Sequence, residues 1–385
     1  MDTFSACMKQ KYGPTQVNED CVRRMAGAGH RRLSENWKER LNMPLTTEEL
    51  QRAVNKGGEN KAPGRDGIGT DFFKATWRAF KDDMLELFPR MFFERKVTEQ
   101  QKRGVILCIP KTAQPTYPTD FRPTTLLNND YKAIARILEN QMRPALVELI
   151  HPSQYCGVHG KSIFDAGATV RDAITYAEVA SIPLCVLSLD FKEVFEKILQ
   201  AYLFNTLKSH GFSDAFIEGI KHMYANATSV VQINGHISGL IPIRSSVRQG
   251  WPLSTTLFPL CLNPLLHRLD QQHNGFRIQQ RQHKTAVVAY ADDVTILVTA
   301  PEDISVIRNA IQCNEATSAV LNQALAVGTW DTKLQVLDIR YADEIKVLSF
   351  SMQKTIARAG KSSWTRITNV VKIQAREAYS RDRGL

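Results

Sequence analysis

Two adjacent aspartates, Asp292 and Asp293, interrupt a stretch of apolar and β-branched residues at 286–298. Runs rich in Val, Ile, Thr and Tyr are typical of β-strands, so the stretch predicts a β-hairpin with the two acids at its tip. Ionised carboxylates among such residues are costly unless a cation compensates them, which favours a bound metal ion. An exposed turn that merely favours Asp is the alternative that this stretch leaves open.

A further acidic position follows an apolar strand predicted at 184–189, where Asp190 ends the run. A strand-ending Asp often caps the following helix, and that interpretation stays open for Asp190. With Asp292 and Asp293 it would instead complete three carboxylates on adjacent strands, and a two-metal centre needs carboxylates that bridge ions about 3.5–4 Å apart. We therefore expect oxygens of Asp190 and Asp292 to lie roughly 3–5 Å apart.

The balance of charge points to a polyanionic partner. The 385 residues carry a formal net charge of +10, and 43% of them are hydrophobic. A basic globular chain favours nucleic acid, with an anionic membrane surface second, and such binding should weaken steeply with salt. The seven cysteines contain no Cys-x-x-Cys pair, no apolar run is long enough for a membrane span, and residues 1–11 lack a signal-peptide core. We expect an intracellular protein of the nucleus or cytoplasm, not a secreted one.

Four basic residues occupy loops that suit phosphate. Lys61 and Arg65 belong to a turn-rich loop, and Lys111 and Arg122 flank the loop that follows a strand predicted at 104–110. Lysine and arginine bind phosphate as a point charge and as a bidentate fork, respectively. For each pair an ordinary solvated loop is the alternative.

Periodicity and turn residues predict further elements. Apolar residues spaced by three and four at 73–91 and 131–142 predict amphipathic core helices. Asn234-Gly235 between apolar runs predicts a type I′ hairpin turn. Residues 1–43 are polar and basic without a motif, and they are interpreted as a boundary remnant or a flexible arm.

Several short stretches occur in a definite order across residues 44–298. They are Lys61-Ala62-Pro63-Gly64-Arg65-Asp66-Gly67, Ile109-Pro110-Lys111, Phe121-Arg122-Pro123, Leu126-Leu127-Asn128-Asn129-Asp130-Tyr131-Lys132, Leu187-Ser188-Leu189-Asp190, Arg248-Gln249-Gly250, Pro252-Leu253-Ser254 and Tyr290-Ala291-Asp292-Asp293. Together they resemble the reverse transcriptases of LINE-type (non-long-terminal-repeat) retrotransposons, and most closely copies from arthropods such as ticks.

The resemblance implies an α+β fold of the right-handed polymerase kind. Fingers and palm would occupy 44–298, and the end of the palm with the start of a thumb would occupy 299–385. Residues 1–43 have no assigned domain. Because the chain stops early and no endonuclease precedes the fingers, the resemblance also implies a truncated copy whose thumb is largely missing.

The same resemblance implies RNA-directed DNA synthesis, in which deoxynucleoside triphosphates extend the 3′-hydroxyl of a DNA primer on an RNA template. Asp190, Asp292 and Asp293 correspond to the carboxylates that bind two Mg²⁺ ions, with Mn²⁺ as a substitute. Lys111 and Arg122 correspond to the fingers residues that meet the incoming triphosphate.

Other positions are carried over in the same way. Phe195 corresponds to the bulky residue that excludes a ribose 2′-hydroxyl. Gln249 and Gly250 correspond to the loop beside the nascent base pair, where a glycine permits close approach of the backbone. Lys61 and Arg65 are candidates for contact with the nucleic-acid backbone. No membrane partner is expected, and the oligomeric state is left open.

Departures from the family pattern favour a rival interpretation, a non-catalytic nucleic-acid-binding remnant of the same fold. Trp251 stands where the family has a small Cys, adding volume where a template should pass, so Trp251→Cys should raise an otherwise feeble extension activity. Pro259 lies inside a predicted helix, where an interior proline costs about 3 kcal/mol unless the helix is kinked there. A lysine expected after Asn322 is missing. An RNA-copying polymerase of another class fits Phe195 poorly.

Overall fold

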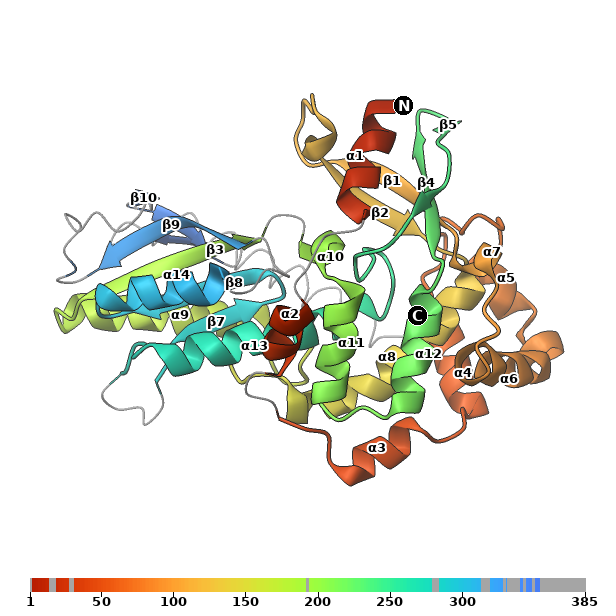
Figure 1. Ribbon diagram of the computed structural model, residues 1–385, viewed down its shortest axis with the longest axis horizontal. Coiled ribbons are helices and arrows are strands. Elements are labelled where there is room, and N and C mark those ends of the chain that lie inside the picture. Colours follow the sequence, from red (N-terminus) through yellow and green to blue (C-terminus); the bar gives the residue numbers. More distant parts are fainter. Residues whose placement is uncertain are drawn as a thin grey trace, which may run out of the picture.

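The fold is that of a computed structural model, and the structure describes residues 2–13, 19–27, 31–191, 194–278, 284–312, 319–327, 330, 340–341, 344–347 and 350–353 (Figure 1). Helices, two five-stranded β-sheets and a separate two-stranded sheet make up this part of the chain, so its class is α+β, as expected. Within it no helix is both long enough and apolar enough to cross a membrane.

The first sheet stands at the top of Figure 1. Its strands are β1 (Gly104–Pro110), β2 (Phe121–Leu126), β4 (Thr228–Ile233), β5 (His236–Ile237) and β6 (Ile241–Pro242). Strand β1 is antiparallel to β2 and parallel to β4. Asn234 and Gly235 both have positive φ in the turn between β4 and β5, which confirms the predicted type I′ hairpin.

The second sheet has the strand order β10-β9-β3-β8-β7, and a separate hairpin joins β11 to β12. These strands are β3 (Leu184–Phe191), β7 (Val287–Tyr290), β8 (Asp293–Val298), β9 (Ala319–Val327), β10 (Arg340–Tyr341), β11 (Glu344–Val347) and β12 (Phe350–Gln353). The region expected to hold the end of the palm and a thumb, 299–385, is described only in part, and residues 354–385 lie outside the described residues.

Helices cover both faces of the second sheet. Leu184 and Val186 of β3 belong to the apolar cluster of α9 (Ile163–Val179). The intervening Cys185 and Leu187 belong to the cluster of α13 (Ser254–Gln272) and α14 (Glu302–Gln312). Because successive strand residues point to opposite faces, burial on both sides explains why this strand is one continuous apolar run.

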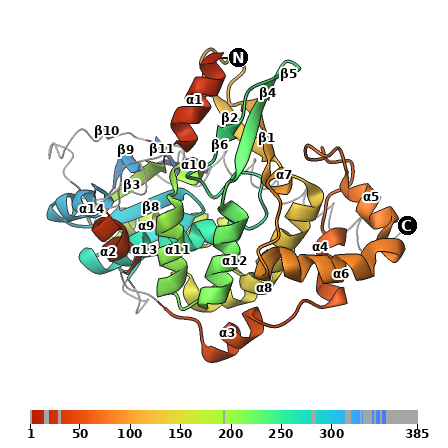
Figure 2. The ribbon, with the colours of Figure 1, turned by 45° about the vertical axis from the view of Figure 1, so that its right-hand side comes forward.

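Most of the remaining helices lie below the first sheet in Figure 2, whereas α1 (Asp2–Tyr12) stands beside that sheet and η1 (Pro118–Asp120) belongs to the connection between β1 and β2. The others are α2 (Glu19–Ala26), α3 (Glu35–Leu41), α4 (Thr47–Asn55), α5 (Thr70–Ala75), α6 (Trp77–Phe93), α7 (Glu99–Lys102), α8 (Asn129–Leu149), α10 (Val194–Lys197), α11 (Gln200–Ser209) and α12 (Asp214–Tyr224). The helix expected at 131–142 is confirmed as part of α8.

The helix expected at 73–91 forms as two helices, α5 and α6, which meet at Thr76. The Thr76 hydroxyl donates to the carbonyl of Phe72 (2.7 Å), a local bond that competes with helix continuation. The apolar stripe is also not all core, because Phe80 and Leu87 are exposed while Met84 and Met91 are buried. The spacing of apolar residues in the sequence does not distinguish the exposed side of α6 from its buried side.

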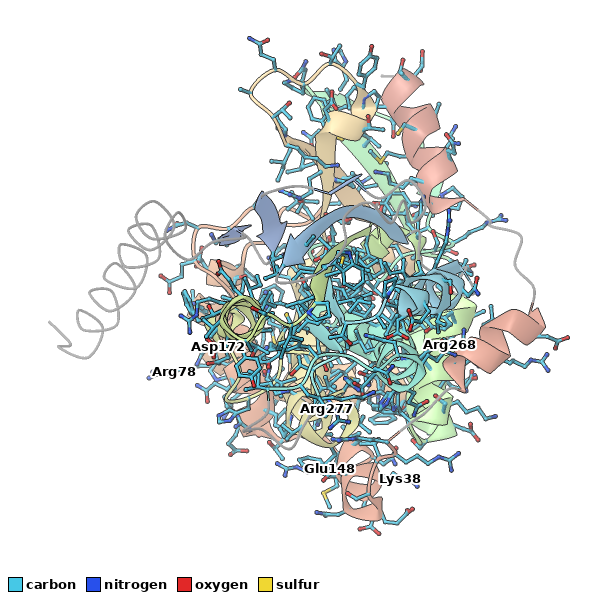
Figure 3. All side chains as sticks on the ribbon, turned by 90° about the vertical axis from the view of Figure 1, so that its left-hand side faces the viewer. Lys38, Arg78, Glu148, Asp172, Arg268 and Arg277 are labelled. Atoms are coloured by element: carbon cyan, nitrogen blue, oxygen red, sulfur yellow. The ribbon has the colours of Figure 1, made fainter. Side chains whose placement is uncertain are left out.

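The N-terminal helices are packed onto the fold. Met8 and Tyr12 of α1 lie in the apolar cluster of the first sheet, and the backbone N–H of Arg244 donates to the Tyr12 carbonyl (3.0 Å). On α3 the indole N–H of Trp37 donates to Glu148 at the end of α8 (2.8 Å). Figure 3 labels Glu148 and Lys38, the residue that follows Trp37. Helices α1 and α3 are therefore packed against the rest of the fold and do not form a flexible arm.

Trp251 lies in the core, with 2% of its surface exposed. Its ring stacks on Tyr131 (centroids 5.7 Å apart, planes at 11°) and meets Tyr224 edge-on (5.0 Å, 85°). The expectation that this indole intrudes on the template path is wrong, because the side chain fills the space between α8 and α12. Pro259 lies inside α13, which continues through it.

We expect Trp251→Cys to destabilise the fold by about 3–5 kcal/mol, because it leaves a cavity between two tyrosine rings. The measurement is the free energy of unfolding from urea titration. Phe80→Cys on the exposed side of α6 is the control and should cost less than about 1 kcal/mol. Unchanged stability of Trp251→Cys together with faster primer extension would restore the template-path interpretation.

Candidate functional site

The turn between β7 and β8 carries the acidic pair. Tyr290 pairs with Asp293, so Ala291 and Asp292 are the two central residues of a tight hairpin. Ala291 has φ +54°, and positive φ at the first central position is the feature of type II′ turns, where glycine is usual. Asp292 is half-buried and Asp293 exposed. The predicted hairpin with both acids at its tip is confirmed.

The backbone of Asp190 reaches the same end of the second sheet. Strand β3 runs antiparallel to β8, and Leu189 pairs with Val294, so Asp190 stands one residue further toward the turn. On its other side Asp190 pairs with Val320 of β9. The register thus brings together the backbones of all three predicted metal-binding aspartates. The side chain of Asp190 lies outside the described part of the structure, so the expected separation from Asp292 stays a prediction.

The donor set at this sheet end suits a hard divalent cation, because carboxylate oxygens are the ligands that Mg²⁺ and Mn²⁺ prefer. Among the side chains that the structure describes, which exclude that of Asp190, no three His, Cys, Asp or Glu residues are placed to hold a metal ion. The surroundings of the turn are partly apolar: burial raises the pKa of the Cys156 thiol, and the charge of Asp292 raises it further.

The two cations of the first sheet lie at one end of the β1–β2 hairpin, Lys111 directly after β1 and Arg122 on β2. Arg122 of β2 pairs with Ile109 of β1, and the N–H of Lys111 donates to the Asp120 carbonyl (2.8 Å), which continues the hairpin. Both basic side chains are exposed. The Lys111 ammonium donates to the Thr119 carbonyl (2.9 Å). The loop folds back, as the triphosphate interpretation of this pair requires.

A loop at 245–251, here the Gln249 loop, joins the first sheet to α13 and contacts α10. The N–H of Val247 donates to the Phe195 carbonyl (2.9 Å), and the Phe195 ring stacks on Phe258 (4.4 Å, 26°). The position expected to exclude a 2′-hydroxyl is therefore tied by backbone to the loop expected beside the base pair.

The Gln249 loop is also bound to β2. The N–H of Thr125 donates to the Gln249 carbonyl (3.0 Å). Gly250 has φ +94°, and a Cβ there would lie 2.6 Å from the Thr125 carbonyl oxygen. Only glycine fits this conformation and this close approach.

Arg248 was not among the predicted site residues, and its side chain is buried beneath the same loop with 2% of its surface exposed. Its guanidinium donates to the Lys102 carbonyl (3.0 Å), and the Lys102 ammonium donates to the Ala225 carbonyl at the end of α12 (3.0 Å). Burial raises the pKa of the neighbouring Tyr131 hydroxyl to about 12. A loop arginine resembles a surface residue in sequence, so no local signal reveals this role.

Lys61 and Arg65 lie in the connection between α4 and α5. Both are exposed on a loop that docks at the start of α8, where the N–H of Arg65 donates to the Asn128 side chain (3.0 Å). A Cβ at Gly64 would lie 2.3 Å from the same Asn128 oxygen, so the loop is closely apposed to α8. No described contact joins either cation to the aspartate turn.

Comparison with known proteins identifies the family. The family described as reverse transcriptase (RNA-dependent DNA polymerase) matches residues 109–351. The Xenopus laevis "Transposon TX1 uncharacterized 149 kDa protein" is 32% identical over 308 residues, which are 79% of this chain and 23% of that protein. The "Retrovirus-related Pol polyprotein from type-1 retrotransposable element R2" of Popillia japonica is 27% identical over 283 residues, covering 69% of this chain and 37% of that protein.

Among solved structures, apo telomerase from Candida tropicalis, truncated from its C-terminal domain, is similar with a TM-score of 0.47 and 13% identity, over 73% of this chain and 59% of that one. The chain spans only 23% and 37% of the TX1 and R2 relatives. The family match includes all three aspartates, the Lys111–Arg122 hairpin and the Gln249 loop. This chain therefore belongs to the reverse transcriptase family, in the group carried by non-long-terminal-repeat retrotransposons.

Proposed function

We propose that this chain is the polymerase region that extends a DNA primer on an RNA template. The observation that carries the proposal is the register of β3 against β8, which brings the backbone of Asp190 to the turn of Asp292 and Asp293. Within it, the helices and first sheet of 44–298 act as fingers, and the second sheet acts as the palm. The part beyond residue 298 belongs to the end of the palm and the start of a thumb.

In this proposal Asp190, Asp292 and Asp293 hold divalent ions, Mg²⁺ with Mn²⁺ as a substitute. When bound, such ions lower the pKa of the primer 3′-hydroxyl and neutralise charge on the leaving pyrophosphate. The aspartates' own contribution is to present carboxylates at the end of a sheet that is buried on both faces. A rigid support of this kind keeps the donor positions from reorganising during the reaction.

The cations of the first sheet serve the nucleotide. Lys111 and Arg122 would meet the triphosphate, whose negative charge pairs with an ammonium and a guanidinium. Gln249 and Gly250 would lie against the nascent base pair, with Phe195 beside the sugar. The hydrogen bonds that join Val247 to Phe195 and Gln249 to β2 support a common role, because they couple these positions mechanically. Lys61 and Arg65 would contact nucleic-acid phosphates.

A non-catalytic remnant of the same fold is the rival. The burial of Trp251 removes one reason for it, since the indole occupies the core. Primer extension separates the two: a remnant binds primer and template but adds no nucleotide.

We expect the unmodified chain to extend a DNA primer on an RNA template. Asp292→Asn should lower the rate of extension by about two orders of magnitude or more, because a bound metal ion stabilises the transition state by several kcal/mol. Each 1.4 kcal/mol, roughly, corresponds to a tenfold change in rate. Asp190→Asn should do the same. Glu86→Gln, on the exposed side of α6, is the charge-matched control. Affinity for primer–template should change little in all three. Extension that survives Asp292→Asn contradicts the assignment, and binding without extension by the unmodified chain supports the remnant.

For the nucleotide cations, we expect Lys111→Ala and Arg122→Ala each to raise the KM for deoxynucleoside triphosphate about tenfold or more, since charge-assisted hydrogen bonds contribute about 1.5–3 kcal/mol. Single-nucleotide addition at varied nucleotide concentration measures this effect. Arg78→Ala on α6, labelled in Figure 3, removes an equal charge elsewhere and should leave KM unchanged. Equal effects of all three variants would show that only net charge matters.

A further inference from the structure

The turn that carries the acidic pair depends on a strained residue. Ala291 immediately precedes Asp292 and has φ +54° without being glycine. Residues with a Cβ rarely adopt this backbone conformation, and they keep it only where neighbouring groups hold the backbone in place. Something outside the hairpin must therefore stabilise Ala291, and whatever does so also sets the direction in which the chain enters Asp292.

Gln154, far away in the sequence, makes that contact. Its side-chain oxygen accepts the Ala291 N–H (3.1 Å), and its side-chain nitrogen donates to the Ala291 carbonyl (3.4 Å). The same oxygen accepts the N–H of Cys156 (3.0 Å). Gln154 has no exposed surface. A carboxamide carries a donor and an acceptor in one plane, so this one group satisfies both backbone polar groups of the strained residue.

The backbone around Gln154 is bound to the same hairpin. Gln154 forms a parallel bridge with Ala289 of β7, an edge strand of the second sheet. The N–H of Tyr155 donates to the Ala289 carbonyl (2.8 Å), and the N–H of Ala289 donates to the Ser153 carbonyl (2.9 Å). The segment therefore covers the edge of β7 and keeps the carboxamide in register with the turn.

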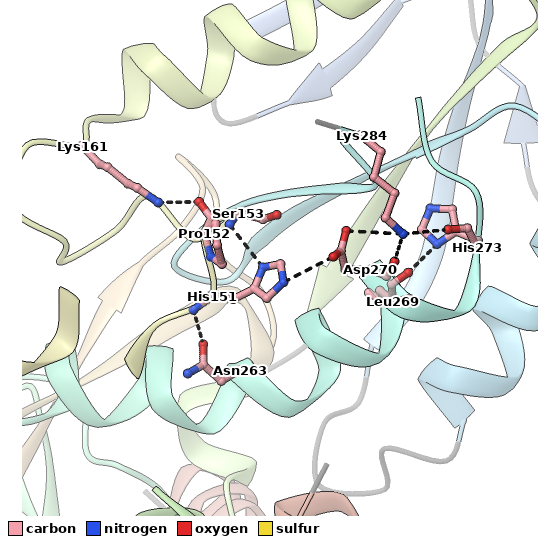
Figure 4. Close-up of polar contacts among 9 residues, drawn as sticks. All are labelled: His151, Pro152, Ser153, Lys161, Asn263, Leu269, Asp270, His273 and Lys284. Atoms are coloured by element: carbon pink, nitrogen blue, oxygen red, sulfur yellow. Dashed lines mark hydrogen bonds and ion pairs between the residues drawn. The ribbon is translucent and has the colours of Figure 1, made fainter. Parts of the chain in front are cut away.

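Two further anchors hold this segment against the rest of the fold (Figure 4). The Lys161 ammonium donates to the carbonyls of Pro152 and Gln154. From α13, the buried Asn263 accepts the N–H of His151 (2.9 Å) and donates to the Leu149 carbonyl (2.8 Å). Gln154 is thus presented from a fixed support rather than from a loose loop.

We propose that Gln154 is a positioning residue for the proposed polymerase reaction: by clamping both backbone groups of Ala291 it sets where Asp292 and Asp293 stand. The inference rests on the proposed function for its catalytic consequence, but the clamp itself is a property of the fold. Gln154 touches neither the aspartate carboxylates nor any proposed nucleotide position in the described contacts.

The test replaces Gln154 by Met, which keeps the length and removes both hydrogen-bonding groups, and by Glu, which keeps the acceptor and removes the donor. We expect Gln154→Met to slow single-turnover nucleotide addition about 10–100-fold, because small misplacements of catalytic groups have effects of that size. Gln154→Glu should slow it as well. The KM for nucleotide and the affinity for primer–template should stay within about twofold. Gln141→Met, a part-buried glutamine of α8 bonded to Glu49, is the matched control.

Rescue separates positioning from general damage. Glycine adopts positive φ without steric cost, so Ala291→Gly placed in the Gln154→Met background should recover at least part of the lost rate. Ala291→Gly in the unmodified chain gives the reference rate for this comparison. No recovery, or a loss of primer–template binding that matches the loss of rate, overturns the proposal.

A readout without catalysis keeps the two proposals distinguishable. Backbone amide exchange at Ala291 should be faster in Gln154→Met than in Gln141→Met, because its acceptor is gone, while exchange within α8 stays unchanged. Unchanged exchange at Ala291 overturns the clamp whether or not the chain is active. If the unmodified chain adds no nucleotide but exchange at Ala291 accelerates as expected, the clamp stands and the polymerase function fails.

Discussion

The antiparallel pairing of β3 with β8 is the constraint on which the rest depends. Both strands are covered by apolar helices on two faces, and a slip of one residue would exchange the faces of every side chain. Burial therefore fixes the register, and the register brings the backbone of Asp190 to the turn of Asp292. A structural requirement of the core and a chemical requirement of the site are met by the same set of backbone hydrogen bonds.

Around that sheet, buried polar groups connect elements that apolar packing alone would leave independent. Arg248 and Lys102 have little exposed surface, and each donates to a backbone carbonyl on another element. Buried cations are costly unless such acceptors surround them, so these contacts favour one arrangement over alternatives. They lie directly beneath the Gln249 loop, which in turn is bonded to Phe195 and β2. The residues proposed to contact the nucleotide are thus held in place by hydrogen bonds within the protein itself.

Local sequence information was sufficient for the parts of the structure that depend on a few neighbouring residues. The hairpin at Asp292 and the strand that ends near Asp190 follow from residue composition over a few positions, and the family resemblance agrees with the comparisons. It failed for Trp251, because burial of that ring depends on tyrosines of two distant helices. It passed over Gln154 for the same reason, since a glutamine signals nothing until its partner, 137 residues away, is in place. The roles of the individual site residues stay predictions.

Metal binding at the second sheet tests the central claim most directly. Titration with Mn²⁺, followed by electron paramagnetic resonance of the free ion, measures it without requiring catalysis or nucleic acid. The account predicts that the unmodified chain binds Mn²⁺ and that Asp292→Asn weakens the affinity at least about tenfold, since even the outer partners of metal ligands contribute that much. Glu86→Gln should bind like the unmodified chain. Equal Mn²⁺ affinity in Asp292→Asn and the unmodified chain would contradict the assignment of the aspartate turn as the metal site.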